Sequence, residues 1–183
     1  MAVSSDADLW QLAAAGDHQA FGDLFERHAE AVWNHAYRLT ASWSQAEDLT
    51  SSTFLLAWRK CGEIRLVRDS ALPWLYTVAG NLARTEYRSA VRFGRVLRRI
   101  PDTSVAEDHA DEVAGRVDGD RRMASILAAV RALPKAERQA IELCLLGEVS
   151  TADAAEALGI AEASVRSRLS RARARLRTVL EDS

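Results

Sequence analysis

The sequence has few cysteines, no long apolar run and no basic leader. Its two cysteines, Cys61 and Cys144, have no Cys-x-x-Cys partner, which excludes a zinc knuckle and a disulfide framework. We expect two ordinary buried or half-buried thiols. No apolar stretch approaches the roughly 20 residues that span a bilayer, and residues 1–11 have no basic start followed by an apolar stretch. We therefore expect a soluble, cytoplasmic protein without membrane insertion.

The formal net charge is only −2, but the charges are unevenly distributed along the chain. Residues 84–99 carry six arginines and one glutamate, and residues 162–177 again carry six arginines and one glutamate. Between them, residues 101–120 carry seven acidic residues against one arginine, with Pro101, Gly115 and Gly119 and hardly any large apolar side chain. This composition predicts an acidic linker, placed at 94–118, between a domain at 1–93 and a domain at 119–183.

Tryptophan follows the same division. All five tryptophans precede the linker, at Trp10, Trp33, Trp43, Trp58 and Trp74. We therefore expect the two domains to have separate cores, and core packing for the last four tryptophans although each could stack on a base.

The apolar spacing predicts helices throughout, and no stretch alternates convincingly with period two. In the first domain we expect helices from Ser5/Asp6 to Ala15, over 17–40, from a cap at Ser44 to Cys61-Gly62, and from Leu72-Pro73 into the first basic segment. In the second domain we expect helices over 119–133, 134–146, 151–158 and 162–180. The predicted fold class is all-α, with two small helical domains.

The last predicted helix contains "SVRSRLSRARARLR" and separates its side chains by type around the helix axis. One stripe is apolar and should face the core: Val165, Leu169, Ala172, Leu176, Val179 and Leu180. Two rows of arginine flank it, Arg166, Arg173 and Arg177 on one side and Arg168, Arg171 and Arg175 on the other. The outward ridge is Ser167, Ser170 and Ala174. Such a low ridge between arginines can enter a DNA major groove.

Taken alone, this helix could also be a solvated charged helix, and less readily a membrane-surface helix, because its apolar stripe lacks aromatic anchors. The preceding residues favour DNA binding. "STADAAEALGIAEASVRSRL" predicts a short helix, a turn at Leu158-Gly159-Ile160 and a second helix, which is a helix-turn-helix with the second helix as reader.

These segments resemble a known family. "LGIAEASVRSRLSRARARLR", preceded by "ALPKAERQAIELCLLGEVSTADAAEA", resembles the C-terminal promoter-binding domain of extracytoplasmic-function sigma factors of bacterial RNA polymerase. "FERHAEAVWNHAYRLTASWSQAEDLTSSTFLLAW" and "PWLYTVAGNLARTEYR" resemble the family's region-two domain, in the right order and spacing. The resemblance covers roughly residues 21–88 and 130–180.

The resemblance implies a role for three sets of residues. Polymerase binding falls on Glu47, Asp48, Ser51 and Ser52, where the family often has Gln-Glu in place of the two serines. Recognition of the minus-ten element falls on Arg68, Asp69 and Ser70 in a loop at 63–70, and on Asn81, Arg84 and Arg88 in the next helix, where this chain has Thr85 and the family often has aspartate. Recognition of the minus-thirty-five element falls on Arg166, Ser167, Arg168 and Arg171.

The resemblance also implies core RNA polymerase, promoter DNA and an anti-sigma factor as partners, and no enzymatic activity. We find no catalytic constellation, and we expect no cofactor and no metal, since His28 and His35 lack a matching Cys or carboxylate cluster. The alternative is a helix-turn-helix regulator that acts without being a polymerase subunit; it would bind its promoter tightly without polymerase. A helical adaptor or an enzyme is a third class, without a supporting motif.

Overall fold

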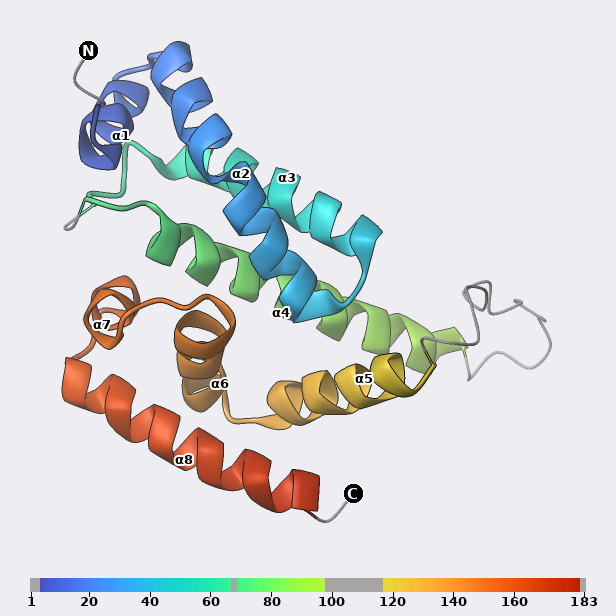
Figure 1. Cartoon of the computed structure of the whole chain (residues 1–183). Coiled ribbons are helices and arrows are strands. Elements are labelled where there is room, and N and C mark those ends of the chain that lie inside the picture. Colours follow the sequence, from blue (N-terminus) through green and yellow to red (C-terminus); the bar gives the residue numbers. More distant parts are fainter. Residues whose placement is uncertain (1–3, 67–68, 98–116, 182–183) are drawn as a thin grey trace.

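The computed structural model describes residues 4–66, 69–97 and 117–181. The elements are α1 (Asp6–Ala14), α2 (His18–Thr40), α3 (Trp43–Lys60), α4 (Leu72–Leu97), α5 (Val117–Ala132), α6 (Lys135–Ile141), the π-helical turn η1 (Glu142–Leu146), α7 (Thr151–Leu158) and α8 (Glu162–Glu181). No strand occurs among these residues, and the all-α prediction is confirmed (Figure 1).

The helices α1 to α4 form the first unit. Helices α2, α3 and α4 pack on one another, and α1 packs on α2. Ser5 caps α1, as predicted, and the structure adds a capping box with Asp8. Helix α2 ends where Ala41 adopts the left-handed conformation, at φ 53°. The cap of α3 is Ser42, whose hydroxyl accepts from Gln45, so the predicted cap at Ser44 is wrong.

The second unit consists of α5 to α8, with α6 and α7 both packed on α8. The predicted helix over 134–146 is not α-helical to its end, because it widens into η1 after Ile141. There the Gly147 N–H reaches the carbonyl of Glu142, at 2.9 Å, five residues back. Such wide turns are rare and often mark functional positions.

The two units are in contact, and the prediction of separate cores is wrong. Their buried apolar residues form one connected cluster that includes Leu75 and Tyr76 of α4 together with Ile141 and Leu143. Helix α4 packs against both η1 and α7, and lies between the units (Figure 1). The positions of the tryptophans show only which residue types each unit uses; they do not show whether two apolar faces meet.

Two arginines also cross between the units through backbone carbonyls. Arg38 Nη1 on α2 donates to the Leu146 carbonyl at 2.7 Å. Arg131 Nη2 on α5 donates to the Leu39 carbonyl at 3.2 Å, and its guanidinium lies 5.0 Å from the centre of the Tyr87 ring. These contacts join α2 and α4 to the second unit.

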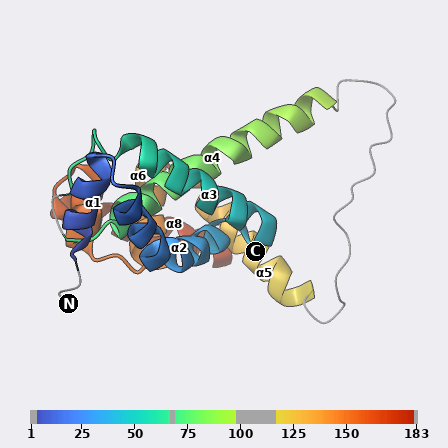
Figure 2. The same cartoon turned by 90° about the horizontal axis from the view of Figure 1, so that it is seen from above.

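The predicted linker at 94–118 falls mostly at 98–116, outside the described residues. Helix α4 continues to Leu97 and α5 begins at Val117. The C-terminal end of α4 extends away from the other helices (Figure 2). Within the described ranges no helix is long and apolar enough to cross a membrane.

The tryptophans differ in burial. Trp10 is buried, and Trp33, Trp58 and Trp74 are half-buried, but Trp43 is 65% exposed and its predicted core role is wrong. Trp43 is the first residue of α3. Its ring meets the Trp33 ring edge-on, with 4.5 Å between the ring centres, and its Nε1 donates to Glu47 Oε1 at 3.0 Å. Cys61 is buried and Cys144 half-buried, as predicted.

Candidate nucleic-acid interface

The helix-turn-helix predicted from the sequence consists of α7 and α8. Ser150 caps α7 by accepting from the Asp153 N–H, and Gly159 ends it in the left-handed conformation at φ 65°. Because an L-side chain is strained there, glycine suits this turn. Thr151 Oγ1 donates to Glu162 Oε1 at 2.6 Å and joins the starts of the two helices.

Helix α8 buries one stripe and exposes the opposite face. Val165, Leu169 and Ala172 are buried against α6 and α7, as predicted, and Leu176 is half-buried. Val179 is 48% exposed, so its predicted core position is wrong. The side chain of Leu180, predicted for the same stripe, lies outside the described residues. The outward ridge of Ser167, Ser170 and Ala174 is exposed.

The arginines of α8 divide into paired and unpaired groups. Arg171 Nε and Arg175 Nε lie 3.4 and 3.0 Å from the two carboxylate oxygens of Glu137 on α6. Arg171 also donates to Ser167 Oγ at 2.7 Å. On the other flank, Arg166 pairs with Glu162 at 2.7 Å.

Sequence reasoning missed Glu137, which is buried and contacts two arginines of the same row. A lone glutamate on a short helix gives no sequence signal of its own. Arg168, Arg173 and Arg177 make no ion pair or hydrogen bond to any residue in the described part of the chain. Their charges are therefore available to an external anion.

The loop before α4 carries the predicted minus-ten residues. Ser70 Oγ accepts from the Leu72 N–H at 3.4 Å, at the start of α4. Asp69 Oδ1 accepts from the Ala7 N–H of α1 at 3.2 Å, a contact that the sequence did not indicate. Arg68 lies outside the described residues.

On α4, Asn81 and Arg84 are brought together. Arg84 Nη2 donates to Asn81 Oδ1 at 3.0 Å. Arg84 also faces Glu142 of η1, and burial lowers the pKa of Arg84. Arg88, one turn further on, is exposed.

Glu142 is a buried acidic residue that faces two arginines. It is 8% exposed, and burial raises its pKa to about 7, against the opposing effect of Arg138 and Arg84. In this arrangement Arg84 therefore faces the second unit, and DNA contact by Arg84 would require Glu142 to move.

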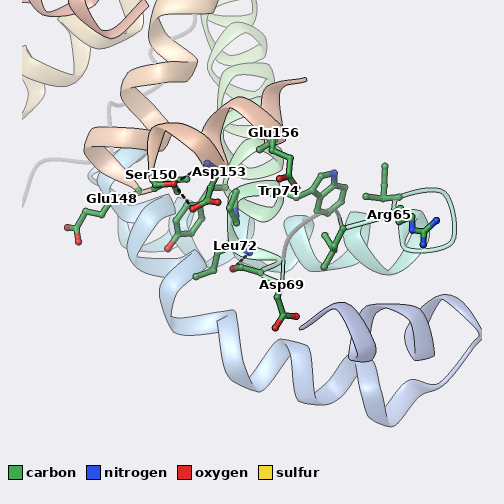
Figure 3. Close-up of a pocket in the computed structure, with 16 residues that line it drawn as sticks. Arg65, Asp69, Leu72, Trp74, Glu148, Ser150, Asp153 and Glu156 are labelled. Carbon is green, nitrogen blue, oxygen red and sulfur yellow. Dashed lines mark hydrogen bonds between the residues drawn. The ribbon is translucent and has the colours of Figure 1, made fainter. Parts of the chain in front are cut away.

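A cavity of about 770 Å³ separates the loop from the helix-turn-helix. Its lining includes Asp69 and Trp74 from the first unit and Asp153 and Glu156 from α7. Figure 3 shows Trp74 beside Glu156 and the acidic side chains of α7 on the side opposite the loop. In this closed arrangement the four lining carboxylates outnumber the single lining arginine, Arg65, and disfavour a nucleic-acid backbone between the loop and α7.

The predicted polymerase-binding residues form a separate surface on α3. Glu47, Asp48 and Ser51 are exposed and Ser52 is half-buried. Burial, together with the nearby charge of Asp48, raises the pKa of Glu86 on α4. This surface is therefore acidic, with the exposed Trp43 at one end.

His28 contacts Asp6, with 2.6 Å between His28 Nε2 and Asp6 Oδ2. His35 is buried against Tyr76, its ring centre 4.1 Å from that of the tyrosine. The described ranges contain no group of three or more His, Cys, Asp or Glu residues that could hold a metal ion.

Comparison with known proteins matches both units. The family model described as Sigma-70 region 2 matches residues 24–93, and that described as Sigma-70, region 4 matches residues 123–176. The ECF RNA polymerase sigma factor SigL of Mycobacterium tuberculosis is 36% identical over 174 residues, which cover 93% of this chain and 94% of SigL. The chain belongs to the extracytoplasmic-function (ECF) family of RNA polymerase sigma factors.

Another sigma factor and two solved structures are also similar to this chain. The RNA polymerase sigma factor NccH of Alcaligenes xylosoxydans is 31% identical over 188 residues, covering 98% of this sigma factor and 97% of NccH. The structure of CnrH in complex with the cytosolic domain of CnrY has a TM-score of 0.66 at 25% identity, covering 98% of this chain and 99% of that chain. The sigma factor RpoE of Bartonella quintana, solved with the anti-sigma factor NepR, has a TM-score of 0.57 at 25% identity, covering 89% and 98%.

The family matches place region 2 over most of α2, all of α3 and most of α4, and region 4 over most of α5 to α8. Sigma factors are regulatory subunits rather than enzymes. This sigma factor directs core RNA polymerase to promoters and promotes initiation of transcription.

Proposed function

We propose that α8 reads the minus-thirty-five element, that the loop before α4 together with α4 reads and holds the minus-ten element, and that α3 binds the polymerase. The observation that supports this assignment most strongly is the exposed face of α8, with its serine and alanine ridge between two rows of arginine. The domains are proposed at 1–93 and 119–183, joined by the linker at 94–118.

On α8, base reading belongs to Arg166, Ser167, Arg168 and Arg171, because residues in the N-terminal half of a recognition helix reach base edges. Arg168 has no partner among the described residues and can form both hydrogen bonds to a guanine edge. Glu162 holds Arg166, and Glu137 with Ser167 holds Arg171, in fixed directions. Arg173, Arg175 and Arg177, further along the helix, bind phosphates.

For the minus-ten element, Arg68, Asp69 and Ser70 face an unpaired base, while Asn81, Arg84 and Arg88 contact the same element from α4. Holding unstacked bases offsets part of the cost of opening the duplex. The neighbouring positions of Asn81 and Arg84, one helical turn apart and hydrogen-bonded, support a shared contact.

Promoter binding requires regions 2 and 4 to separate. The positions that name the minus-ten and minus-thirty-five elements differ by about 25 base pairs. This separation is about 85 Å of B-DNA at 3.4 Å per base pair. In the structure Arg38 and Arg131 instead hydrogen-bond directly across the two units. The closed arrangement therefore belongs to the free sigma factor, and the two units move apart when both elements are bound.

On the polymerase side, Glu47, Asp48, Ser51 and Ser52 form the docking surface. Their exposure and the local negative charge suit a basic partner surface. Ser51 and Ser52 offer weaker contacts than Gln-Glu, because a serine side chain is shorter than either and lacks the charge of glutamate.

An anti-sigma factor controls this protein in our proposal, as a partner that covers the polymerase- and DNA-binding faces. Support comes from the similar sigma factor solved with the anti-sigma factor NepR. The proposal also includes a cytoplasmic location, because core polymerase and promoter DNA are cytoplasmic.

The proposed function is tested by run-off transcription with purified core polymerase on DNA from upstream of the protein's own gene and on a genomic promoter pool. We expect specific transcripts only when both the sigma factor and core enzyme are present. The absence of a polymerase-dependent transcript from every template would contradict the proposal.

A further inference from the structure

Helix α1 lies outside the residues matched to region 2, yet it is bonded to both ends of the minus-ten loop. At the start of the loop, Trp10 Nε1 donates to the Ile64 carbonyl at 2.9 Å. At its end, the Ala71 N–H donates to Asp6 Oδ2 at 2.8 Å. Two residues of α1 thus fix where the loop leaves α3 and where it enters α4.

A third bond reaches the loop between these ends. Asp69 Oδ1 accepts from the Ala7 N–H at 3.2 Å, in the first turn of α1. The N–H groups of a first helical turn lack helical partners and attract negative charge. Because Asp6 accepts from the loop and Ala7 donates to it, the two adjacent residues make reciprocal contacts.

Asp6 is itself firmly held. It is 4% exposed, and its carboxylate also contacts Arg27 Nη1 at 2.7 Å and His28 Nε2 at 2.6 Å. Burial alone would raise the pKa of Asp6, but the Ala71 N–H, Arg27 and His28 outweigh it and hold that pKa below its usual value. The carboxylate therefore stays charged and keeps all of its partners.

Trp10 connects the loop to a cavity-lining aromatic. It is 3% exposed, and its ring meets the Trp74 ring edge-on, with 5.3 Å between centres. Trp74 lines the cavity beside the loop together with Ile64 and Asp69. The α1 contacts thus fix the same loop that faces the cavity.

We propose that α1 is a positioning element for minus-ten recognition, in which Asp6 and Trp10, together with the bond from Ala7 to Asp69, fix the two ends of the loop that accepts an unpaired base. The inference rests on the proposed role of this loop. A loop whose two ends are fixed, at Ile64 and at Asp69 to Ala71, loses less conformational freedom on binding, so selectivity for the base increases. The bond from Ala7 to Asp69 Oδ1 gives Asp69 a positioning role in addition to its proposed place facing the base.

The test uses holoenzyme assembled from core polymerase and full-length sigma factor, transcribing templates whose minus-ten positions are randomised. Trp10→Phe removes the donor to Ile64 but keeps a ring against Trp74. Asp69→Ala removes the acceptor for Ala7, whereas Asp69→Asn retains one. We expect Trp10→Phe and Asp69→Ala each to lower the preference for the favoured base about fivefold, as for loss of one hydrogen bond, and Asp69→Asn to retain most of it.

Leu12→Ala, at a 48% exposed leucine of α1 that makes none of these contacts, is the matched control and should keep the wild-type preference. Holoenzyme assembly is measured for every variant. If Trp10→Phe and Asp69→Ala lowered transcript yield equally for all minus-ten sequences, with the base preference unchanged, α1 would be only structural and the inference would fail. A wild-type holoenzyme with no minus-ten preference would instead refute the proposed function of the loop.

Discussion

Glu142 and Gly80 meet so closely that region 4 leaves no room for a side chain at position 80. A Cβ added at Gly80 would lie 2.9 Å from Glu142 Oε2. Gly80 lies on α4 of region 2 and Glu142 on η1 of region 4, so this contact measures how tightly the two regions pack. Variants at position 80 therefore report on the closed arrangement.

Gly80→Ala should stabilise the protein less than Gly22→Ala does. Gly22 also lies within a helix, but a Cβ there meets nothing within 4 Å, so we expect that variant to gain up to about 1 kcal/mol in free energy of unfolding. At position 80 the same helical gain is opposed by displacement of Glu142. Chemical denaturation measures the free energy of unfolding of both variants. In a Glu142→Ala background, Gly80→Ala should stabilise the protein as much as Gly22→Ala does. Equal gains at 80 and 22 in the wild-type background would contradict the close contact.

The pH dependence of stability should contain two opposing contributions. Glu142 has a pKa of about 7 instead of 4.5, so the folded state binds more protons between these values and stability falls as pH rises. Burial lowers the pKa of His35 from 6.5 to about 4, so between those values the unfolded state binds more protons and stability rises with pH. Each contribution has a slope of at most about 1.4 kcal/mol per pH unit.

Single substitutions should separate these two slopes. Glu142→Gln should leave stability rising with pH between 4.5 and 6.5, and His35→Phe should leave it falling over the same interval. Denaturant unfolding at a series of pH values provides the measurement. Two variants with the wild-type slope would show that neither group titrates in this way.

Arg168→Ala and Arg177→Ala should weaken promoter use in different ways. Loss of a base contact by Arg168 should cost about 1–3 kcal/mol of discrimination at one base pair of the minus-thirty-five element. Loss of a phosphate contact by Arg177 should lower affinity equally for all sequences. It should also reduce the slope of log K against log salt concentration by about one. Neither should alter core binding. Transcription of templates with single base changes, at several salt concentrations, distinguishes them; identical profiles would mean that the two roles are misassigned.

Asp6→Ala should destabilise region 2 strongly. It would leave His28 and the Ala71 N–H without their buried partner, which we expect to cost about 3–5 kcal/mol. Asp8→Ala, two residues on, removes an exposed partner in the capping box and should cost about 1 kcal/mol. Thermal and denaturant unfolding compare the two variants, and similar losses would argue against the Asp6 network.

The helices could be predicted from the sequence because each one has a regular apolar stripe and local end signals. Gly159 and Ser150 mark the turn and the cap of the helix-turn-helix by local chemistry alone. Ser42 and Ser44 are equally good caps by type, and the structure has the cap at Ser42, directly after the left-handed Ala41. Trp43 is apolar by type but lies at a helix start, where it stays 65% exposed beside Trp33.

The candidate site was less predictable, because its decisive contacts join residues far apart in the chain. The bond from Ala7 to Asp69 spans 62 positions and that from Ala71 to Asp6 spans 65. Glu137 pairs with Arg171 and Arg175 only because α6 packs on α8. A helical wheel gives the faces of α8 but not the helix opposite them.

The most direct test of the account is transcription from a promoter library randomised at both elements, with and without core polymerase, followed by sequencing of the transcribed templates. We predict transcripts only with core enzyme, with sequence selection at both the minus-ten and the minus-thirty-five positions, and loss of the latter selection in Arg168→Ala. Selection at a single element, or tight selective binding of the same templates by the sigma factor without core polymerase, would contradict the account.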